Sequence, residues 1–180
     1  LRKRFIYGSL RTDAPIAMKV TIISDTHGGH DQLGALRGDV LIHCGDLENL
    51  FQHDQGAIAA LDAWFGRQSF AHILCIGGNH DRSLQSALGT GRAPFKNATC
   101  LHESETTIDG LKFYGSSWVP LLPDHAFFAD PDALAQAWSK IPDDVDVLIT
   151  HTPPAGILDT SSRGDKLGCP LLSHRLAALS

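Results

Sequence analysis

Polar side chains that can bind metal ions follow directly after four apolar runs of the sequence. In chain order they are Asp25, His27, Asp46, Asn79, His80 and His151. Carboxylates, imidazoles and one amide oxygen form a mixed ligand set, which suits manganese, iron, zinc or magnesium rather than the metals that thiolates select. If these side chains meet, they form a centre that can hold two divalent metal ions.

The four apolar runs are predicted to be the β-strands that bring these side chains together. The runs are short and β-branched, and they lie at 19–24, 39–44, 71–77 and 144–150. Near-continuous apolar strands are typical of a sheet that is covered on both faces. Because ligands of open α/β sheets bind at the carboxyl ends of the strands, we expect the four strands to deliver their polar residues to one edge.

Helices and a hairpin complete the predicted α/β fold. An apolar stripe at 58–65 indicates a helix between the second and third strands, and Asp130 is the predicted N-cap of another helix. Asp109 and Gly110 lie between two extended runs, which indicates a tight hairpin and therefore some antiparallel pairing. The segment 170–179 is predicted to be a final helix.

Each short motif also has an ordinary structural interpretation. Asp and Gly often end strands as turn residues, and a single histidine after a strand is usually a hydrogen-bonded surface residue. The conjunction is more specific, because D-x-H, GD, GNHD and a strand-terminal histidine occur in order and each follows a strand. The set therefore favours metal binding.

These motifs resemble those of the calcineurin-like metallophosphoesterase superfamily, and the resemblance covers 19–180. The motifs are DTH at 25–27, GD at 45–46, GNHD at 78–81 and THTPP at 150–154. Two longer stretches, SETTIDGLKFYGSSW and VLITHTPPAGILDTSSRGDKLGC, resemble the metallophosphoesterase-domain-containing branch of small phosphodiesterases. The resemblance implies an α/β sandwich of two mixed β-sheets flanked by helices.

The resemblance also implies a set of metal ligands. Asp25 and His27 would bind the first metal ion. Asp46 would bridge both ions, and Asn79 with His151 would bind the second. The implied reaction is hydrolysis of a phosphoester by a hydroxide held between two divalent ions, and the implied substrates are small phosphodiesters, including cyclic nucleotides.

Two residues of the GNHD motif are expected to face the substrate. In the family, the histidine that corresponds to His80 stabilises the phosphoryl oxygens or protonates the leaving group, which suits the pKa of an imidazole. Asn79 would also contact the substrate, and Asp81 could orient the ring of His80.

One family motif is missing, because this chain has no GH-x-H after THTPP. We expect a chain that lacks the closing strands of the fold, with 18–180 as the phosphoesterase domain and 1–17 as an extension before Met18. A truncated or frameshifted product is the favoured explanation. Alternatively, a partner chain completes the sheet, or water fills the missing ligand positions. His174 is the one nearby histidine that could substitute, but its place within a helix favours a solvated surface position.

Composition restricts the remaining function classes. The 180 residues carry a formal net charge of -5 and no basic cluster beyond the first few residues, which argues against a nucleic-acid surface and favours a small phosphoester substrate. Four widely spaced cysteines are predicted to be reduced thiols of a cytoplasmic protein, and no apolar run is long enough to span a membrane. The rival interpretation is a non-catalytic scaffold of the same fold, or a catalytically impaired fragment.

Overall fold

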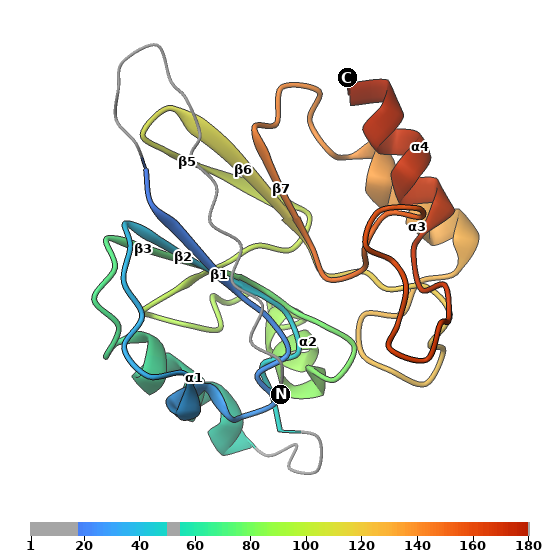
Figure 1. The fold of residues 1–180 in the computed structure, drawn as a ribbon. Coiled ribbons are helices and arrows are strands. Elements are labelled where there is room, and N and C mark those ends of the chain that lie inside the picture. The colour runs from blue at the N-terminus through green and yellow to red at the C-terminus, as the bar shows by residue number, and fades with distance from the viewer. Residues whose placement is uncertain (1–17, 50–54, 180) are drawn as a thin grey trace.

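The first of two β-sheets is wholly parallel. The structure is a computed structural model that describes residues 18–49 and 55–179. The strands of the first sheet pair in the order β1 (Val20–Ile23), β2 (Val40–Cys44), β3 (His72–Ile76) and β4 (Thr99–Cys100). Helices α1 (Gln55–Phe65) and α2 (Arg82–Leu88) lie against this sheet, where Trp64 and Leu84 pack with Leu41 in one buried cluster (Figure 1).

The second sheet mixes antiparallel and parallel pairing. Its order is β5 (Ser104–Ile108), β6 (Leu111–Ser116) and β7 (Val147–Thr150), with an antiparallel β5–β6 hairpin and a parallel β6–β7 pair. Asp109 and Gly110 join the hairpin with φ angles of 48° and 81°, the left-handed backbone that a tight turn needs. The predicted hairpin is therefore confirmed.

Two further helices cover the second sheet. They are α3 (Pro131–Ser139) and α4 (Pro170–Leu179), which lie side by side (Figure 1). The Asp130 carboxylate accepts a hydrogen bond from the backbone N–H of Ala133, so Asp130 is the N-cap that the sequence predicts. Trp138 is 1% exposed and anchors α3 in a cluster with Tyr114 and Leu172. The side chains on this face of α3 hold the helix to the sheet.

A shared core joins the two sheets face to face. Ile42 and Ile76 of the first sheet belong to one buried cluster with Phe113 and Ile149 of the second. The predicted α/β sandwich of two sheets flanked by helices is thus confirmed. Only the second of the two sheets is mixed, because every strand pair of the first is parallel. One detail of the strand prediction is wrong, because the strand at 144–150 does not join the other three. It pairs with β6 instead, and its end meets theirs because the two sheets pack together.

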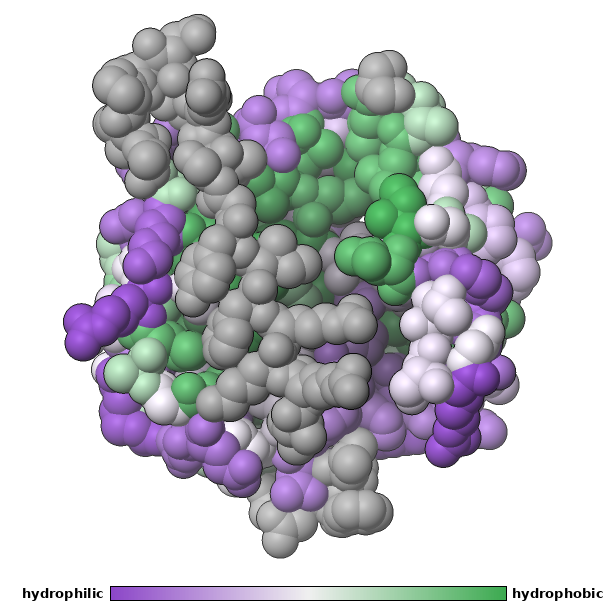
Figure 2. Space-filling view, viewed as in Figure 1, coloured by the Kyte–Doolittle hydropathy of each residue, from purple (hydrophilic) through white to green (hydrophobic). Residues whose placement is uncertain are grey.

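The outer edge of the second sheet carries apolar surface. Among the described residues β7 pairs only with β6, and its Val147 and Leu148 are partly exposed. Figure 2 shows apolar residues gathered over β7 and toward α4, with polar residues around them. The predicted extension at 1–17 lies outside the described residues. Among the helices of the described chain, none is long and apolar enough to cross a membrane.

Candidate metal centre

The loops after β1 and β2 run side by side and continue the pairing of their strands. The backbone N–H groups of Asp25 and His27 donate to the carbonyl oxygens of Gly45 and Asp46, each at 3.0 Å. Asp25, His27 and Asp46 all have left-handed backbone, with φ of 55°, 45° and 55°. Three neighbouring non-glycine residues in this sparsely populated region are strained, and such strain is concentrated at functional sites.

Asp25, His27 and Asp46 form the first group of possible ligands. One ligand atom from each lies within 4.8 Å of the others, and the Nε2 atom of His27 is 3.7 Å from Oδ2 of Asp46. That separation is too long for a hydrogen bond. It suits two atoms that share one ion, because ligands at about 2.0–2.2 Å in tetrahedral geometry lie roughly 3.5 Å apart.

His151 and Asn79 form a second group, which also includes Asp46. The Nδ1 atom of His151 lies 2.8 Å from the carbonyl oxygen of Cys44, which can only accept, so Nδ1 carries the proton. The Nε2 atom of the same ring lies 3.1 Å from Oδ1 of Asn79 and 3.5 Å from Oδ1 of Asp46. An imidazole nitrogen, an amide oxygen and a carboxylate oxygen converge here, and all three are ligand types of divalent metal ions. The donor set therefore fits a metal ion, and the N–H bond to a backbone carbonyl is typical of a metal-binding histidine.

Asp46 lies between the two groups. Its Oδ2 faces His27 and its Oδ1 faces His151, and Oδ1 also accepts a hydrogen bond of 2.9 Å from the backbone N–H of His80. Asp46 is 3% exposed, so its carboxylate is held in one orientation by buried surroundings.

Gly78 lets the loop after β3 approach this carboxylate. A Cβ atom at Gly78 would lie 2.4 Å from Oδ1 of Asp46 and 2.8 Å from Cε1 of His151. A side chain at this position would therefore push apart the two ligand groups. Gly78 does not have a positive φ, so backbone conformation does not require glycine here. The close approach to Asp46 and His151 is what requires a residue without a side chain.

The Asp81 carboxylate binds the backbone of the loop and does not contact the ring of His80. Its two carboxylate oxygens accept hydrogen bonds from the backbone N–H groups of Gly78, at 2.7 Å, and Glu48, at 2.8 Å. The pKa of Asp81 is raised to about 7, chiefly by burial; the two backbone hydrogen bonds oppose the rise, and the nearby charges of Asp46 and Glu48 add to it. The structure thus corrects the expectation that Asp81 orients His80.

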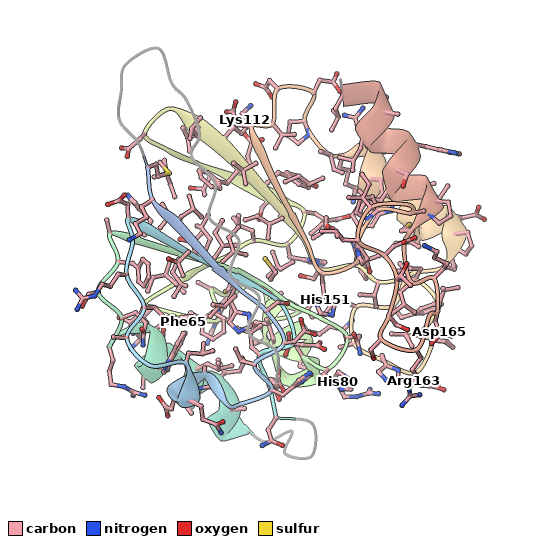
Figure 3. The ribbon with its side chains drawn as sticks, viewed as in Figure 1. Phe65, His80, Lys112, His151, Arg163 and Asp165 are labelled. Carbon is pink, nitrogen blue, oxygen red and sulfur yellow. The ribbon has the colours of Figure 1, made fainter. Side chains whose placement is uncertain are left out.

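His80 lies at the open side of the centre. Its ring packs edge to face against His27 with centroids 5.2 Å apart, and Figure 3 shows His80 and His151 in the same region of the molecule. Within the part of the chain that the structure describes, no hydrogen bond engages the ring nitrogens of His80, and these nitrogens are not buried. The imidazole is therefore free to contact a bound substrate.

The structure brings all six predicted site residues together and adds one that the sequence did not indicate. The added residue is His125, whose ring packs against His80 with centroids 5.5 Å apart. A single histidine in a loop has no spacing or motif that could have identified it. His174, the possible substitute ligand, is exposed on α4, and it is absent from the metal-binding group found among the described residues.

Comparisons with known proteins agree with this arrangement. The family model described as calcineurin-like phosphoesterase matches residues 18–177. UPF0046 protein K07C11.7 of Caenorhabditis elegans is 34% identical to this chain over 88% of the chain and 58% of its own length. Metallophosphoesterase domain-containing protein 1 of Homo sapiens is 29% identical over 82% of this chain and 52% of its own length.

The chain thus spans a little over half the length of the curated relatives it matches. The match covers every strand and all six predicted site residues, and the names of the relatives agree with the predicted branch. Together with the two-sheet fold, these findings establish that the chain belongs to the calcineurin-like phosphoesterase family.

Proposed function

We propose that this chain hydrolyses small phosphodiesters with a centre of two divalent metal ions. The observation that carries the proposal is the position of Asp46, whose two carboxylate oxygens face two different groups of ligands. A carboxylate in that position can bridge two ions about 3.5–4 Å apart. Family membership supports metal-dependent phosphoester hydrolysis as the general reaction.

Each ion would have its own ligands. Asp25 and His27 would hold the first ion and Asn79 and His151 the second, with Asp46 shared. The amide of Asn79 adds a ligand without adding negative charge, so the centre retains positive charge for an anionic phosphate. When bound, the ions would neutralise charge on the phosphoryl oxygens and help to activate water.

His80 would act on the substrate and not on a metal. The hydrogen bond from its backbone to Asp46 fixes the start of the side chain at the centre, while its ring nitrogens remain accessible. An imidazole so placed can donate a hydrogen bond to a phosphoryl oxygen or a proton to the leaving oxygen. The acidic net charge of the chain favours small diesters, including cyclic nucleotides, over a nucleic-acid polymer.

The test is manganese-dependent hydrolysis of bis(p-nitrophenyl) phosphate by the purified chain. Asp46→Asn leaves one uncharged oxygen in place of the carboxylate that both groups share, and it should lower kcat/KM at least about 100-fold. Asp109→Asn is the matched control, because Asn-Gly forms the same hairpin turn, and it should leave the rate unchanged. If the Asp46→Asn rate equals that of the unaltered chain, the assignment is wrong. Manganese binding without hydrolysis would instead favour an impaired enzyme or a scaffold.

A further inference from the structure

The loop between β6 and α3 is closed on itself and attached to the metal centre. Its ends are tied by hydrogen bonds from Val119 N–H to the Phe127 carbonyl, at 2.9 Å, and from Ala129 N–H to the Val119 carbonyl, at 3.1 Å. Phe127 is 1% exposed, and a Cβ atom at Gly77 would lie 2.3 Å from its ring. The loop is therefore anchored directly against the GNHD turn, as a compact surface loop with a functional position can be.

Two more contacts hold the tip of this loop beside the centre. The backbone N–H of Ala126 donates to the carbonyl oxygen of Asn79 at 3.0 Å. The guanidinium of Arg82 donates to the carbonyl oxygen of Asp124. His125, between these two anchored residues, is thus held on both sides.

The ring of His125 extends a series of histidine contacts outward from the metal centre. His27 contacts His80 at 82° between ring planes, and His80 contacts His125 at 86°. Neither ring nitrogen of His125 has a hydrogen bond within the described residues, and neither is buried. Leu121 of the same loop is 72% exposed, so its apolar side chain faces solvent. Its φ of 66° is left-handed, which is strained for leucine.

We propose that His125 packs against the leaving group of the substrate and selects phosphodiesters in which that group is a planar ring. The inference rests on the proposed function, with His80 donating its proton to the leaving oxygen. A ring attached to that oxygen would extend beyond His80, where the partly exposed imidazole of His125 offers an aromatic surface. Aromatic pairs of this kind contribute selectivity of about three- to tenfold.

Two phosphonates test this selectivity without hydrolysis, because their P–C bond is stable. Phenylphosphonate and methylphosphonate share one anionic group and differ in the ring, and their affinities are measured calorimetrically in the presence of Mn²⁺. The unaltered chain should bind phenylphosphonate about three- to tenfold more tightly than methylphosphonate. His125→Ala should reduce this ratio to less than about twofold, His125→Phe should restore it, and the affinity for methylphosphonate should remain unchanged in both variants.

The control is His72→Ala, because His72 is exposed at the opposite end of β3. This variant should keep the ratio of the unaltered chain. An unchanged ratio in His125→Ala, or an equal loss of affinity for both phosphonates, overturns the role of His125 and leaves the proposed function standing. If the unaltered chain binds neither phosphonate but hydrolyses bis(p-nitrophenyl) phosphate, the role of His125 fails alone. If it neither binds the phosphonates nor hydrolyses the diester, both proposals fail.

Discussion

Acid should destabilise the metal-free protein through one buried histidine, His43 near the carboxyl end of β2. Its side chain is fully buried, and its Nε2 lies 2.9 Å from the hydroxyl of Thr26. The pKa of His43 is lowered to about 3, chiefly by burial and to a smaller extent by the neighbouring rings of His30, His151 and His27. The folded protein thus keeps this imidazole neutral at pH values where an unfolded chain protonates it.

The sign and size of the effect follow from proton linkage. The unfolded chain binds a proton at His43 below pH 6.5, whereas the folded chain does so only near pH 3, so stability is present above pH 6.5 and falls as the pH drops. Each pH unit in this window costs about 1.4 kcal/mol. Lowering the pH from 6.5 to 5 should therefore reduce the free energy of unfolding by about 2 kcal/mol through His43 alone.

Urea denaturation of His43→Gln and the unaltered chain at pH 7 and pH 5 measures this term. A chelator keeps both proteins metal-free, so that loss of metal at low pH does not contribute. Glutamine does not titrate and can still form a hydrogen bond with Thr26, so His43→Gln should lose about 2 kcal/mol less between the two pH values. His72→Gln, at an exposed position, should behave like the unaltered chain. Equal losses in His43→Gln and the unaltered chain would refute the reasoning.

Two further substitutions test the site and the fold. Gly78→Ala should weaken manganese binding, measured by calorimetry, at least about tenfold, because the added methyl group would overlap the Asp46 carboxylate. The control is Gly89→Ala, whose methyl group would lie 3.4 Å from its nearest atom, and this variant should bind manganese as the unaltered chain does. Equal manganese affinities in the two variants would contradict the close approach of Gly78 to Asp46. Asp130→Ala removes the N-cap of α3 and should lower the free energy of unfolding by about 1 kcal/mol in urea, and a loss below about 0.3 kcal/mol would mean that the cap contributes little.

The strands and the site residues could be predicted from the sequence because both produce local patterns. β-branched apolar runs identify β1, β2, β3 and β7, and polar residues directly after them identify the side chains that meet at the centre. The partition of strands between two sheets could not be predicted. It depends on the pairing of β7 with β6, which is a contact between segments that are distant in the sequence.

Residues that act through tertiary contacts were harder to identify. Asp81 directly follows His80, which suggested a contact with its ring, yet the fold directs the Asp81 carboxylate toward two backbone N–H groups. His125 reaches the site only because Phe127 packs over Gly77 and fixes the loop. Neither arrangement leaves a periodic signal in the sequence.

The number of manganese ions bound with and without the Asp46 carboxylate tests the central claim most directly. Calorimetry, together with electron paramagnetic resonance, should give two Mn²⁺ ions per chain and the spectrum of a coupled pair, since a shared carboxylate holds ions about 3.5–4 Å apart. Asp46→Ala should abolish the coupled spectrum and at least one of the two binding events. A single uncoupled ion in the unaltered chain, or a coupled pair that persists in Asp46→Ala, would contradict the account.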